Sequence, residues 1–154
     1  MLDKKHAQSL LYSYRYLFKT CDLIDKMINN YATNFGVMYA HADTETLAEK
    51  MIDLMQRKKH LINLKLYIDK VISLTNDTSK KILVLMSQFE FKIGKIQEIF
   101  DVSERTAFRY MKTAVDEFVS VANRVKGIDM DALQQNDSWI FNLSHTYACS
   151  RITA

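Results

Sequence analysis

The sequence predicts an all-α protein in which a long antiparallel helical hairpin is followed by a C-terminal helix-turn-helix lobe. Three observations indicate this fold class. The chain of 154 residues has no proline and only three glycines, so it lacks the sharp turns that β-rich folds need. Its hydrophobic content of 48% is enough to form a buried core. Apolar residues recur at three- and four-residue steps over long stretches, which is the period of amphipathic helices.

Residues 1–76 are predicted to form the hairpin. A first helix is expected over 4–31, followed by a loop that starts at Asn34-Phe-Gly36 and reaches Asp43. The second helix is expected from a cap at Asp43 or Thr44 to Leu74, a length of roughly 45 Å. One small core hardly covers a helix of that length. We therefore expect it to pair with the first helix, and a homodimer through its other side is a further hypothesis.

Residues 77–126 are predicted to form the lobe. After a polar break at 75–79, a helix is expected over 79–91, then a short helix, a three-residue turn and a helix that starts at Glu104 with Ser103 as its cap. The residues expected to point inward in this unit are Ile96, Ile99, Phe100, Val102, Ala107, Tyr110 or Met111, Ala114 and Phe118. Residues 127–154 form a tail, in which a short helix is expected to pack back on a lobe.

Basic residues are concentrated around the predicted turn. The segment from Thr78 to Lys112 contains seven basic and four acidic residues, an excess equal to the net charge of +3 of the whole chain. A basic surface beside a helix-turn-helix suits phosphate binding, although a modest excess is also common on solvated helices. The residues predicted to contact DNA are Lys92, Lys95, Ser103, Glu104, Arg105, Thr106, Phe108, Arg109 and Lys112.

These candidates have different expected roles. Arg105 and Arg109 share one helix face, from which guanidinium groups can reach base edges. The lysines are expected to contact phosphates. The alternative for the two arginines is a solvated pair with Glu104 or Asp101 as partners, and Phe108 at helical spacing is also consistent with a core residue.

The segment 96–109 resembles the region-four helix-turn-helix of sigma factors, and more closely the small phage regulators of the RinA and ArpU type, in which a helical hairpin precedes that unit. The resemblance covers about residues 44–119. It implies a sequence-specific DNA-binding regulator of phage or prophage late transcription, with the second helix in the major groove of double-stranded DNA. Gln97 and Asp101 depart from the family, which usually has alanine and glycine at these positions.

Two other functions remain open in the sequence. One is a helical protein-interaction module, such as an adaptor or an anti-sigma-like partner, and the other is a small terminase subunit. Whether RNA polymerase is a partner also stays open. Glycine-rich phosphate loops, nucleophile elbows and paired catalytic carboxylates are absent from the sequence, so an enzyme is not expected. The basic run 57–60 is interpreted as a solvated helix face, with DNA backbone or an acidic partner as the alternative.

Cysteine and histidine usage predicts neither a metal nor another cofactor. Cys21 and Cys149 are far apart and near no histidine pair, so a zinc site or a disulfide framework is not indicated. The sequence begins without an export signal, and no apolar run approaches the roughly 20 residues that span a bilayer. A soluble protein of the reducing cytoplasm, without a membrane partner, is therefore expected.

Overall fold

The computed structural model describes residues 2–33, 44–89 and 92–142, and these residues form helices and the connections between them, without any strand. The helices are α1 (Lys4–Thr33), α3 (Thr44–Ser73), α4 (Asp77–Gln88), α5 (Ile93–Phe100), α6 (Glu104–Ala122) and α7 (Met130–Asn136). The predicted all-α class is confirmed. The expected loop at 34–43 and the tail beyond residue 142 lie outside the described residues.

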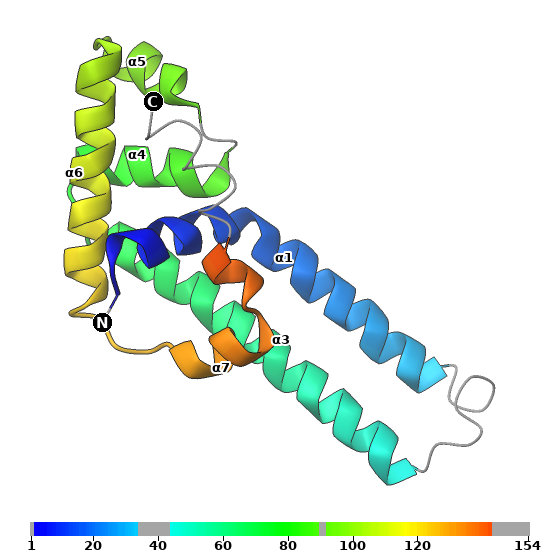
Figure 1. Cartoon of the computed structure of the whole chain (residues 1–154). Coiled ribbons are helices and arrows are strands. Elements are labelled where there is room, and N and C mark those ends of the chain that lie inside the picture. The colour runs from blue at the N-terminus through cyan, green and yellow to red at the C-terminus, as the bar shows by residue number, and fades with distance from the viewer. Residues whose placement is uncertain (1, 34–43, 90–91, 143–154) are drawn as a thin grey trace.

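The long helices α1 and α3 form the predicted antiparallel hairpin, whose far end projects away from α4, α5 and α6 (Figure 1). Leu10, Leu17 and Ile24 on α1 are fully buried, as are Leu61 and Leu64 on α3. Polar pairs fix the register of the two helices along their length. The Tyr14 hydroxyl donates to Asp69 at 2.6 Å, and Lys58 Nζ lies 2.7 Å from an Asp25 carboxylate oxygen.

Helix α4 begins at Asp77, two residues before the predicted start, because the cap is Asn76. Its side-chain oxygen accepts from the Ser79 amide at 2.9 Å, which satisfies one of the amides that a helix start leaves unpaired. The helix ends at Gln88, earlier than predicted, because the backbone of Phe89 is already extended; residues 90–91 lie outside the described part of the chain.

Helix α6 joins the lobe to the hairpin, since it packs against α4 and α5 as well as against α1 and α3. The Tyr67 hydroxyl of α3 donates to the Ala122 carbonyl at 2.7 Å, and burial raises the pKa of this phenol. At the same end, the Leu2 amide donates to Asn123 Oδ1 at 2.9 Å. The hairpin and the lobe therefore share one core rather than folding around two separate ones.

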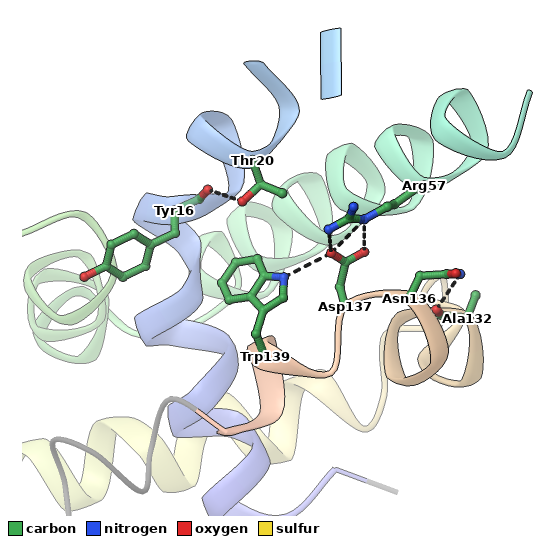
Figure 2. A network of polar contacts seen from close by, with 7 residues as sticks. All are labelled: Tyr16, Thr20, Arg57, Ala132, Asn136, Asp137 and Trp139. Carbon is green, nitrogen blue, oxygen red and sulfur yellow. Dashed lines mark hydrogen bonds and ion pairs between the residues drawn. The ribbon is translucent and has the colours of Figure 1, made fainter. Parts of the chain in front are cut away.

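The C-terminal segment is fastened to the hairpin by a buried carboxylate (Figure 2). Asp137 is only 1% exposed and accepts from Arg57 Nη2 at 2.6 Å, from Arg57 Nε at 3.0 Å and from Trp139 Nε1 at 3.0 Å. The hydrogen bond to Asp137 raises the pKa of Arg57. This segment contains a short helix, α7, which packs along α3 of the hairpin.

No helix in the described ranges is both long enough and apolar enough to cross a membrane.

Replacing Asp137 by asparagine is expected to lower the free energy of unfolding by about 2 kcal/mol. The substitution keeps the side-chain shape but leaves the half-buried Arg57 guanidinium without its counter-charge. Urea denaturation of the variant measures the loss. The matched control is Asp22→Asn on the exposed side of α1, which is expected to change stability by less than about 0.5 kcal/mol. Equal stabilities of the two variants would show that the network does not stabilise the fold.

Candidate nucleic-acid interface

The turn between α5 and α6 depends on a left-handed residue, Asp101. Its φ of 51° and ψ of 54° make it the one non-glycine residue with positive φ in the described part of the chain. Its amide and that of Val102 both point to the Gln97 carbonyl, so the end of α5 is satisfied by the turn itself. Aspartate tolerates this conformation better than most residues. The chain can therefore make the turn with Asp101, although the family that segment 96–109 resembles usually has glycine here.

Ser103 caps α6 as predicted. Its hydroxyl oxygen accepts from the Thr106 amide at 3.3 Å and lies 3.1 Å from the Thr106 hydroxyl. The helix accordingly begins at Glu104, whose carboxylate lies in the first turn, where the helix dipole favours negative charge. Both hydroxyls are engaged in the cap, so the structure gives Ser103 and Thr106 a role in positioning α6.

The inner face of the unit is largely as predicted. Ile96, Ala107 and Ala114 are fully buried, and the Phe100 and Tyr110 rings meet edge to face with centroids 5.8 Å apart. The small side chain of Ala107 lets the two helices approach closely. The prediction for Ile99 is wrong, because this side chain is 53% exposed. Helix α5 has only eight residues, and the stripe it buries runs through Ile96 and Phe100, which leaves Ile99 outside.

The solvent face of α6 carries Arg105, Arg109 and Lys112. All three side chains are exposed, and their spacing of four and three residues puts them on one face, opposite Ala107, Met111 and Ala114. No ion pair to any of the three occurs among the described residues, so the partners considered for the arginines, Glu104 and Asp101, do not neutralise them. We call these three residues the basic stripe.

The basic stripe ends at a neutralised carboxylate. Asp116, one turn beyond Lys112 on the same helix face, forms an ion pair with Lys4 at 2.7 Å. The positive charge of the stripe is therefore confined to the first half of α6, beside the turn. This half of the helix forms one edge of the molecule, away from the hairpin (Figure 1).

The remaining candidates fall into two groups. Lys92 and Lys95 are exposed at the start of α5, with Lys92 as its cap residue. Phe108 was expected to point outward from α6, but it is half-buried and packs against the core, as the alternative interpretation had it. The reason is its position on the flank of α6, where its ring covers the edge of the apolar stripe.

The structure adds neighbours of Arg109 that sequence reasoning missed. A shallow recess of about 390 Å³ is lined by Asn76, Asp77, Thr78, Ser79, Arg109, Tyr110 and Thr113. Glu117 holds two of these residues in place, accepting from the Asn76 amide at 2.7 Å and from the Ser79 hydroxyl at 2.6 Å. No local signal brings residues 76–79 beside Arg109, because their proximity depends on how α4 packs across α6.

Two side chains of the basic run 57–60 form ion pairs within the molecule. Arg57 is engaged by Asp137 and Lys58 by Asp25, so a purely solvated face does not describe these two side chains. Their partners lie far away in the sequence, which is why local reasoning could not find them.

No protein-family model, curated protein or solved structure matches this chain. The resemblance of segment 96–109 to sigma region four and to the phage regulators stays a prediction from the sequence.

The left-handed conformation of Asp101 leads to a paired stability test. Asp101→Val is expected to lower the free energy of unfolding by about 1–2 kcal/mol, because a β-branched residue is strained in this region. Asp101→Gly should stay within about 1 kcal/mol of the wild type, since glycine adopts the conformation freely. Asp101 is exposed, so neither change affects packing. Equal stability of the two variants in urea denaturation would contradict a constraint at this turn.

Proposed function

We propose that the protein is a sequence-specific DNA-binding regulator of transcription whose helix α6 enters the major groove. The observation that carries the proposal is the basic stripe of Arg105, Arg109 and Lys112. It is exposed, without ion pairs among the described residues, and set on a capped helix directly after a tight turn. Helix-turn-helix readers present the start of their second helix to base edges in this way.

Each cation of the stripe has a distinct role in this proposal. Arg105 and Arg109 are roughly 6 Å apart along the helix axis, close to the height of two base pairs. A guanidinium can bind a guanine edge through two hydrogen bonds, so these side chains are the proposed base readers. Lys112, with Lys92 and Lys95 at the start of α5, would hold the phosphates on either side and set the orientation of the helix.

The anchoring of α6 supports this proposal. Glu117 ties the helix to the start of α4, and the Tyr67 hydroxyl ties its last turn to α3. A reader needs its side chains held in a fixed geometry, which polar contacts at separate points provide. The resemblance of segment 96–109 extends the proposal to late transcription of a phage or prophage, with RNA polymerase as a second partner.

A protein-interaction module is the second candidate, favoured by the exposed apolar side chains of the hairpin, among them Phe18 and Leu66. The two functions differ in their response to salt. Phosphate contacts make affinity for duplex DNA fall steeply with ionic strength, whereas an apolar docking surface binds no DNA at all. The third candidate, a small terminase subunit, would assemble into a ring. The mass in solution distinguishes such a ring from a monomer or dimer.

The double variant Arg105→Ala/Arg109→Ala is expected to weaken binding to a selected target duplex at least about 30-fold, because each lost base contact costs about 1–3 kcal/mol. The target comes from selection of bound sequences out of a random pool, and affinity is measured by fluorescence anisotropy. The control Lys19→Ala/Lys26→Ala removes two exposed cations of α1 and should bind as the wild type does. Undiminished binding by the double variant, with helicity intact by circular dichroism, would refute the proposal.

Lys112→Ala tests the phosphate role separately. The variant is expected to bind selected and random duplexes more weakly by a similar factor, and the slope of log K against log salt should become shallower by about one unit. Titrations of the wild type and the variant at several salt concentrations measure both slopes. A loss restricted to the selected sequence would instead make Lys112 a base reader.

A further inference from the structure

Helix α3 has a second apolar face, which no part of the described chain covers. Ile52, Met55, Ile62 and Leu66 are between 40% and 58% exposed. With Lys59 they follow the three- and four-residue spacing of a coiled-coil seam, and they lie opposite the buried Leu61, Leu64 and Ile68. We call these four apolar residues and Lys59 the outer stripe.

The extent of the outer stripe is that of a contact surface. From Ile52 to Leu66 it spans roughly 21 Å of helix, about four turns. Single exposed apolar residues are ordinary on a protein surface, whereas several large ones on one helix face mark an interaction site. A helix with apolar residues on two opposite faces gains stability when both faces are covered.

The charges beside the outer stripe indicate what covers it. Glu45 and Glu49 are exposed near the start of α3, and Lys70 is exposed near its end. None of the three forms an ion pair among the residues that the structure describes. Two α3 helices placed antiparallel would bring the acidic end of each beside the basic end of the other. A parallel arrangement would set like charges against one another.

We propose that the outer stripe binds a second copy of this chain, with the two α3 helices antiparallel about a twofold axis. Such an interface is self-complementary, because the same patch serves both copies, and the four long helices would lie side by side with the two α3 helices in the middle. Lys59 lies in the middle of the stripe, where its stem covers apolar surface and its ammonium group reaches the rim. A lysine at such a position lowers the affinity, so Lys59→Leu is expected to tighten the dimer.

This proposal does not depend on DNA binding. If both proposals hold, the dimer carries two basic stripes, and two weak contacts with DNA reinforce each other. The experiments below contain no DNA, so a failure of dimerisation and a failure of the proposed function are distinguished.

Sedimentation equilibrium over a wide concentration range tests the association. The wild type is expected to approach twice the 18.0 kDa of one chain as its concentration rises. Met55→Glu/Leu66→Glu should raise the dissociation constant at least about 100-fold, since each buried side chain of this size contributes about tenfold or more. Both residues are more than half exposed, so helicity by circular dichroism should not change.

The matched control is Leu23→Glu/Met27→Glu, which changes two similarly exposed apolar residues on α1. It should dimerise as the wild type does. A wild type that stays monomeric up to millimolar concentration would overturn the proposal and leave the outer stripe to a different protein. A dimer equally sensitive to both double variants, or to neither, would overturn its assignment to α3.

Exchanging the charges of Glu49 and Lys70 tests the antiparallel orientation of the two α3 helices without changing any apolar residue. Glu49→Lys and Lys70→Glu should each weaken the dimer, and the variant carrying both should recover most of the wild-type affinity, because the antiparallel pairs form again with reversed signs. Absence of any recovery in the double variant would overturn the antiparallel arrangement, even if the apolar variants failed to fold.

Discussion

The burial of the inner face of α6 is the constraint on which the rest of the structure depends. Phe118 and Ala114 are fully buried, and the same helix contacts α4, α5 and both helices of the hairpin. Because one face of α6 is committed to this core, the opposite face is left to solvent in the first half of the helix. The exposure of Arg105, Arg109 and Lys112 is therefore a consequence of packing on the other side.

Apolar burial alone would not fix the rotation of α6, because it has little directional preference. The polar contacts supply the direction. Glu117 meets the cap of α4, Tyr67 meets the last turn of α6, and Asn123 exchanges hydrogen bonds with Leu2. These contacts are spread along the helix, so together they set both its rotation and its position along the axis.

The sequence was most informative where short-range chemistry decides the structure. The periodicity of residues 4–31 and 44–74 predicted both long helices, and Ser103 marked the start of α6, because caps and stripes depend on neighbours a few residues away. Ile99 was misjudged since its spacing suits the inner face, but α5 is too short to bury a second row. The pairing of Arg57 with Asp137 and the recess beside Arg109 depend on contacts between residues far apart in the sequence. No local sequence pattern predicts them.

The distance in sequence between Arg57 and Asp137 also bears on how the chain folds as it is made. The two residues are 80 positions apart, so at synthesis rates of about 5–20 residues per second the carboxylate appears roughly 4–16 s after the arginine. Helical hairpins form within microseconds to milliseconds. During synthesis α1 and α3 would thus pair long before Asp137 exists, and the nascent hairpin would carry an unneutralised cation in its middle until the last helices dock.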